Sequence, residues 1–335
     1  MSDGHGGLGN QRDGGWSPDV LGADYAQCTF EMGPDADSHD GEPVVATLVR
    51  HERSRGAERG AVLYVHGYTD YFFQTHVAEH FAGQGFAFHA LDLRRCGRSL
   101  RPGQTPHYAS DLAVYDEELD RALALLRRDH DHVVVVAHST GGLITPLWLD
   151  RRRVAGHEKV AGLVLNSPWF DLQGPAYYRH VGTVGIDVVG RLQGMRLLTK
   201  DVADAYGASL HVSREGEWDY DLDWKPLEGF PVRLGWMRAV RRSQAALHRG
   251  LDVGAPSLVL RSARTQFAEH YSAAVDTADA VLDVGQIARW AGCLGGRTSV
   301  VPIEDARHDV YLSQPAPLAV AFAETTSWLD ATLPR

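Results

Sequence analysis

The sequence predicts an α/β protein with a mostly parallel sheet and helices on both faces of that sheet. Short apolar runs alternate with segments of helical pattern, which is typical of parallel strands joined by crossover helices. Most of these runs are apolar at consecutive positions, as expected of strands that are buried on both faces. The alternation stops over residues 169–256 and then resumes, so we expect one inserted segment within a single fold.

The net charge of the chain indicates which kind of binding partner to expect. The chain has 335 residues, and 33 Lys and Arg against 43 Asp and Glu give a net charge of −10. An acidic chain without a sustained basic run is unsuited to non-specific binding of nucleic acid or anionic membranes. We therefore expect a small-molecule partner and no nucleic acid.

Cysteine usage and apolar runs bear on the compartment. Cys28, Cys96 and Cys293 are odd in number and far apart, which favours a reducing environment over a disulfide framework. We find neither a signal-peptide pattern nor a transmembrane run of about 18 apolar residues. These observations predict a cytoplasmic protein without a transmembrane segment.

The elements follow in order along the chain. Residues 1–22 are rich in Gly, Asp and Ser and predict a flexible N-terminal tail. The predicted core, 23–168 and 257–335, holds eight strands at 25–32, 43–50, 61–65, 86–93, 133–137, 160–165, 257–260 and 298–303. The first two strands should pair antiparallel, and helices are expected over 111–128, 141–152 and 316–329. The aromatic, helix-leaning segment 169–256 predicts a cap inserted after the sixth strand.

A candidate nucleophile lies where the valine-rich run at 133–136 meets a helix. Ala137-His138-Ser139-Thr140-Gly141 matches the G-x-S-x-G nucleophile elbow, with Ala in place of the first Gly. Such a turn exposes the serine Oγ and aims the helix N-terminus at a developing oxyanion. The alternative, a serine that only caps the helix, fits this strand-to-helix context less well.

The oxyanion donors and the general base are sought on other loops. Tyr68 follows the strand at 61–65, so its backbone N–H and that of Thr140 form the expected oxyanion pair. His308, on a loop between the last strand and the final helix, is the expected base. We interpret His66 and His138 as structural or pocket-lining residues.

The carboxylate that orients the base should follow the strand at 257–260. From the residues alone, Asp276, Asp279 and Asp283 are all candidates for this role. With the order Ser, Asp, His, residues 44–329 resemble the α/β-hydrolase superfamily. The closest resemblance is to monoacylglycerol lipase-like and lysophospholipase-like serine hydrolases, often labelled serine aminopeptidase S33. Their acid motif corresponds to 279–283, so the resemblance implies Asp279 as the acid and Asp283 as runner-up, although an insertion over 263–277 delays it.

The resemblance also implies a function and a pocket. It implies a carboxylic-ester hydrolase that works through an acyl-enzyme on a small-molecule ester, without cofactor or metal. The cap would cover the catalytic face, and the substrate-binding residues expected there are His138, Trp169, Trp218 and Trp236. Peptidase or thioesterase activity and an idle ligand-binding protein are the alternatives. One motif departs from the family: Arg95 and Cys96 stand where a Gly-His pair is usual.

One competing signal suggests metal chemistry. The segment from His76 to His80 matches the H-x-x-E-H zinc-protease pattern, with both histidines on one face of a predicted helix. No downstream third zinc ligand is evident, so we consider the metal-site hypothesis weaker than the serine-hydrolase hypothesis. The run at 129–132 is read as solvated charge in a loop.

Overall fold

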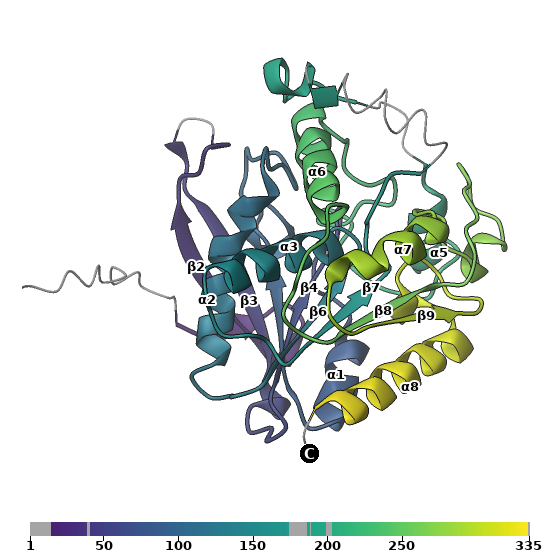
Figure 1. Ribbon diagram of the computed structural model, residues 1–335. Coiled ribbons are helices and arrows are strands. Elements are labelled where there is room, and N and C mark those ends of the chain that lie inside the picture. Colours follow the sequence, from purple (N-terminus) through teal and green to yellow (C-terminus); the bar gives the residue numbers. More distant parts are fainter. Residues whose placement is uncertain (1–14, 39–40, 174–185, 188, 199–202, 334–335) are drawn as a thin grey trace, which may run out of the picture.

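A nine-stranded sheet forms the centre of the molecule. The computed structural model describes residues 15–38, 41–173, 186–187, 189–198 and 203–333 (Figure 1). The strands in these residues are β1 (Ser17–Asp19), β2 (Gly22–Gly33), β3 (Val44–His51), β4 (Ala61–Val65), β5 (Ala87–Asp92), β6 (Val133–His138), β7 (Gly162–Asn166), β8 (Ser257–Ser262) and β9 (Thr298–Ile303). Their order in the sheet is β1-β2-β3-β5-β4-β6-β7-β8-β9. The strands from β5 to β9 in this order are parallel, and β1, β2 and β3 are antiparallel to their neighbours.

Helices cover both faces of the sheet, as predicted. They are α1 (Thr75–Gly83), α2 (Asp116–Leu126), α3 (Gly141–Val154), α5 (Ala205–Leu210), α6 (Leu234–Leu247), α7 (Val284–Trp290) and α8 (Pro315–Thr332). Alternate residues of β4 serve the two faces: Val62 and Tyr64 pack with α1 and α8, whereas Leu63 and Val65 pack with α2 and α3. Figure 1 shows α1 and α8 together on one side of the sheet. The predicted helix at 111–128 opens with a 3₁₀ turn (Leu112–Tyr115) before α2 begins.

The prediction of a tail over residues 1–22 is wrong at its carboxyl end, and among the described residues the sheet has nine strands rather than the predicted eight. Residues 1–14 lie outside the described residues, but Ser17–Asp19 form β1 and pair with β2. Buried Asp19 binds Arg98 through a 2.6 Å ion pair, and the Arg50 guanidinium lies 3.9 Å from the Trp16 ring centroid. This strand has only three residues, which is too short for apolar periodicity to reveal it.

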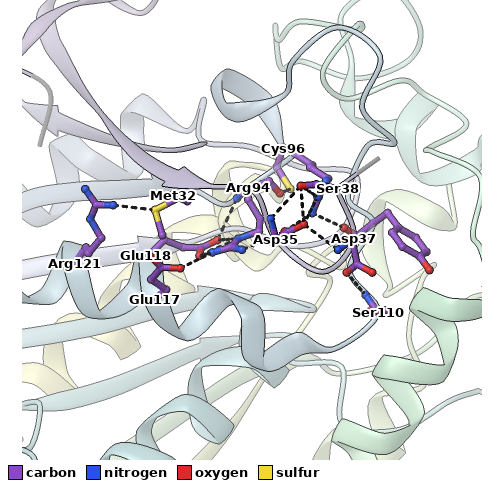
Figure 2. Close-up of polar contacts among 12 residues, drawn as sticks. Met32, Asp35, Asp37, Ser38, Arg94, Cys96, Ser110, Glu117, Glu118 and Arg121 are labelled. Atoms are coloured by element: carbon purple, nitrogen blue, oxygen red, sulfur yellow. Dashed lines mark hydrogen bonds and ion pairs between the residues drawn. The ribbon is translucent and has the colours of Figure 1, made fainter. Parts of the chain in front are cut away.

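Arg95 and Cys96, the two departures from the family motif, have structural partners. Arg95 adopts a positive φ of 63° and its Nη2 donates to Asp35 Oδ1 at 2.6 Å. The neighbouring Arg94 bridges Asp35 and buried Glu118, which fastens the turn after β2 to α2 (Figure 2). The Cys96 thiol contacts His107 Nδ1 at 3.2 Å. Burial raises the pKa of Cys96 and lowers that of His107, so both are neutral near pH 7.

The segment 169–256, here called the cap segment, lies between β7 and β8. Its described residues contribute α5 and α6 and no strand to the sheet. In the part of the chain that the structure describes, no helix combines the length and apolarity that a membrane crossing requires.

Buried histidines make stability depend on pH. Burial lowers the pKa of His89, on β5, to about 3, whereas an unfolded histidine titrates near about 6.5. Below about pH 6.5, His89 of the unfolded chain binds a proton, whereas His89 of the folded chain stays neutral. The free energy of unfolding therefore falls as the pH drops. When the pH is lowered from 7.5 to 4.5, the unfolding free energy of wild type should fall by about 2 kcal/mol more than that of His89→Gln. Urea unfolding at both pH values measures this, with exposed His157→Gln as control. Equal losses in all three proteins would contradict it.

Candidate active site

Ser139 occupies a tight turn between β6 and α3. Its φ is +50°, a left-handed conformation that costs a non-glycine residue roughly 1–2 kcal/mol. Backbone bonds hold it there, because Ser139 N donates to Asn166 O at 3.0 Å and Trp169 N donates to Ser139 O at 3.0 Å. A Cβ on Gly141 would lie 2.4 Å from the His66 carbonyl oxygen, so only glycine lets α3 begin so close to the loop after β4.

Ser139, His308 and Asp279 form one chain of hydrogen bonds. His308 Nε2 lies 3.0 Å from Ser139 Oγ, and His308 Nδ1 lies 2.9 Å from Asp279 Oδ2. All three side chains are buried. The other carboxylate oxygen, Asp279 Oδ1, accepts the N–H groups of Val281 at 2.8 Å and Leu282 at 2.7 Å. These two bonds fix the carboxylate, so its Oδ2 faces the imidazole.

The other two candidate carboxylates bond elsewhere. Asp283 caps α7 by accepting the Gly285 N–H at 2.9 Å. Asp276 accepts from Arg307 Nη2 at 2.9 Å and from the Tyr271 hydroxyl at 2.7 Å. The inserted loop returns to the end of β8, where Asp279 N donates to Arg264 O at 2.9 Å, and this pairing delivers Asp279 to His308.

Tyr68 and Thr140 both border Ser139. A Cβ on Gly67 would lie 2.9 Å from Ser139 Cβ, so the loop that carries Tyr68 passes in contact with the serine. Thr140 is the N-cap of α3, where free backbone N–H groups and the helix dipole favour negative charge. Both residues line the cavity described next.

A cavity of about 300 Å³ adjoins Ser139 and His308. Its lining is mainly aromatic and aliphatic and includes the predicted residues His138, Trp169 and Trp236. Trp236 packs on Tyr68 with ring centroids 4.0 Å apart and on Trp169 at 5.6 Å. Trp218 does not reach the cavity, because it stacks on His76 at 4.4 Å and donates to Leu312 O at 2.9 Å. An aromatic-rich segment predicts burial but not the surface against which each ring is buried.

Sequence reasoning missed a buried charged group beside the site. Asp70 Oδ2 lies 3.2 Å from His138 Nδ1, and its Oδ1 accepts from Lys225 Nζ at 2.8 Å. Burial raises the pKa of Asp70, but the Lys225 charge and the His138 bond outweigh it and hold that pKa well below its usual range. Burial lowers the pKa of His138, yet the carboxylates of Asp309 and Asp70 raise it above the ordinary value. Asp70 could have been noticed beside Gly67, whereas no pattern marks Lys225.

The remaining predicted histidines have structural partners. His66 Nε2 accepts the Leu93 N–H at 3.1 Å, and its Nδ1 lies 2.7 Å from Gly67 O. In the zinc-like motif, His76 Nε2 donates to Tyr311 O at 2.7 Å and His80 Nε2 lies 3.2 Å from Thr326 Oγ1. Within the described residues, no three His, Cys, Asp or Glu side chains are grouped to hold a metal ion.

Comparison with known proteins finds a family model and a curated relative that match this chain. A family model described as serine aminopeptidase, S33, matches residues 56–281, which is more than half of the chain. The uncharacterized protein YnbC of Escherichia coli (strain K12) is 28% identical over 152 residues. That match covers 45% of this chain and 25% of the relative, so the chain corresponds to about a quarter of the relative's length.

Solved structures share the fold over most of both chains. A soluble variant of monoglyceride lipase from Saccharomyces cerevisiae is similar with a TM-score of 0.63 and 13% identity, covering 91% of this chain and 95% of that one. A monoacylglycerol lipase from Paleococcus ferrophilus gives a TM-score of 0.62 and 18% identity, with 82% and 95% covered. A putative aryl esterase from Burkholderia cenocepacia gives a TM-score of 0.51 and 17% identity, and the match covers 91% of this chain and 98% of that one. At such identities the likeness establishes the α/β-hydrolase fold.

Proposed function

The chain belongs to the serine aminopeptidase S33 family, and from this premise we propose that it hydrolyses carboxylic esters through an acyl-enzyme on Ser139. The observation that carries the proposal is the buried hydrogen-bonded series Ser139, His308 and Asp279 at the wall of an apolar cavity. A nucleophile, a base and an orienting carboxylate within hydrogen-bond reach are the parts that acyl transfer requires.

The roles follow from the atoms that face one another. His308 Nε2 removes the proton of Ser139 Oγ as this oxygen attacks the ester carbonyl. Asp279 Oδ2 accepts the His308 Nδ1–H, which places the lone pair on Nε2 and stabilises the imidazolium that forms. The backbone N–H groups of Tyr68 and Thr140 donate to the tetrahedral oxyanion.

Collapse of the intermediate breaks the ester C–O bond, and His308 returns its proton to the departing alkoxide. Water then attacks the acyl-enzyme, with His308 again as base, and releases the acid and free Ser139. The cavity supports a substrate with a small acyl or aromatic group, because about 300 Å³ is at the lower end of ligand pockets. Ester chemistry, rather than amide chemistry, is supported by the lipase and esterase descriptions of the structural neighbours.

Turnover of p-nitrophenyl esters of increasing acyl length tests the proposal. We expect turnover with an optimum at short chains, because longer chains exceed the cavity. An alkyl fluorophosphonate should inactivate the enzyme, and mass spectrometry of the digest should place the adduct on Ser139. Labelling without ester turnover would favour an amide or thioester substrate. Neither labelling nor turnover would favour a ligand-binding protein on the same fold and would refute the proposal.

A further inference from the structure

The cap segment is bonded to four consecutive residues of the loop that carries the proposed oxyanion donor. This loop, Tyr68–Tyr71, follows β4 and is here called the oxyanion loop. Its hydrogen bonds with the cap segment include Tyr68 OH to Pro231 O at 3.2 Å, Phe230 N to Thr69 Oγ1 at 3.0 Å, Lys225 Nζ to Thr69 O at 3.3 Å, Lys225 Nζ to Asp70 Oδ1 at 2.8 Å, and Asp221 N to Tyr71 OH at 2.8 Å. The cap segment therefore holds the loop along its whole length.

Lys225 is the cation among the residues of these contacts, and it is buried. Only 6% of the residue is exposed, and its ammonium lies 5.8 Å from the Phe73 ring centroid and 5.7 Å from that of Tyr220. A buried ammonium is costly unless it is paired and hydrogen-bonded. Asp70 supplies the opposite charge and Thr69 supplies a carbonyl, so the location of Lys225 is stable only while the oxyanion loop keeps its present conformation.

The loop needs such support because its backbone is strained next to the donor. Thr69 has a φ of +50°, and the N–H of the preceding residue, Tyr68, is the one that would meet the oxyanion. Left-handed non-glycine residues persist where surrounding contacts determine them. Thr69 is held from the cap segment at both its carbonyl and its hydroxyl, by Lys225 and Phe230. Loss of these contacts would free the loop to relax and turn the Tyr68 N–H away.

We propose that Lys225 is a positioning residue of the oxyanion hole: through Thr69 O and Asp70 it fixes the oxyanion loop so that the Tyr68 N–H meets the reacting carbonyl. The inference rests on the proposed function and extends it, because it makes the cap segment part of the machinery for the chemical step. An amide displaced by about 1 Å from an oxyanion loses much of its stabilising effect.

This role is distinguished from that of a pocket wall by the kinetic parameter that changes. Lys225 also borders the cavity, and a residue that only binds substrate would alter KM. A residue that positions an oxyanion donor acts in the transition state and lowers kcat. Lys225→Met keeps the aliphatic length and removes the charge and the donors, so it separates the two roles.

The test compares wild type, Lys225→Met, Lys225→Arg and Arg238→Met with one p-nitrophenyl ester. We expect Lys225→Met to lower kcat about 10- to 100-fold with KM within about twofold, and Lys225→Arg to recover part of the loss. The second-order rate of fluorophosphonate labelling should fall in parallel, since the phosphonyl oxygen occupies the same hole. Arg238→Met is the matched control, because it removes a 2.8 Å cap ion pair with Asp187 that does not involve the oxyanion loop.

Tyr71→Phe gives a second measurement that does not depend on a stable Lys225 variant. It removes only the hydroxyl that accepts the Asp221 N–H, and we expect a kcat about three- to tenfold lower with the same KM. The inference is overturned if folded Lys225→Met keeps its kcat or changes KM alone, or if Tyr71→Phe has wild-type kcat when Lys225→Met does not fold. Wild-type protein that neither turns over esters nor is labelled would overturn the proposed function, and this inference with it.

Discussion

Ser139→Ala and His308→Ala should each lower kcat/KM for esters by about 10⁴- to 10⁶-fold, and the double variant should be no slower than either single variant. Ser139 Oγ lies 3.0 Å from His308 Nε2, and in the proposed mechanism the two side chains act as one unit. Without the hydroxyl no acyl bond forms, and without the imidazole no base removes its proton. Steady-state assays of the three variants, with thermal unfolding to confirm folding, measure both the loss and its non-additivity.

Ser167→Ala is the matched control for this experiment. Ser167 follows β7, is fully buried, has a φ of 45°, and its hydroxyl has no hydrogen-bond partner among the described residues. Its replacement should leave kcat/KM within about threefold, because no proposed step uses that hydroxyl. Substantial activity in Ser139→Ala, or losses that multiply in the double variant, would show that another group is the nucleophile.

The architecture was predictable because the evidence for it is local. Strands buried on both faces appear as apolar runs, and the run at 133–136 ends in a small-x-Ser-x-Gly turn that marks the carboxyl end of β6. The sheet order from β3 onward then follows from the α/β-hydrolase fold. β1 was missed because it has only three residues and because its ion pair joins Asp19 to Arg98, which are 79 positions apart.

The residues of the candidate site were predictable only where a motif or chain order marks them. Lys225 and Asp70 are 155 residues apart, and their contact exists because the cap segment docks on the oxyanion loop. Trp218 and Trp236 both belong to the aromatic-rich cap segment, yet Trp218 packs beside His76 on α1 rather than in the cavity. Periodicity shows that a side chain is buried, whereas docking decides what it meets.

Asp279 is the proposed acid, and Asp279→Asn should lower kcat about 10⁴-fold. Asp279 Oδ1 accepts two backbone N–H groups, from Val281 and Leu282, so the oxygen of an asparagine is held at that position. Its amide nitrogen then faces His308 Nδ1 and donates to it. The imidazole proton moves to Nε2, which leaves no lone pair to accept the Ser139 proton.

Asp283→Asn is the matched control, four residues along the same loop. Asp283 accepts the Gly285 N–H at the start of α7, and asparagine caps helices about as well as aspartate does, so kcat and stability should change little. Steady-state kinetics on the two variants decide between the carboxylates. A severe loss of kcat in Asp283→Asn, together with an active Asp279→Asn, would mean that Asp283 faces His308 in solution. The loop from β8 to α7 would then have to rearrange so that Asp283 takes the place of Asp279. That rearrangement would break the bonds from Val281 and Leu282 to Asp279 and uncap α7, and its combined cost opposes any replacement of Asp279 by Asp283 beside His308.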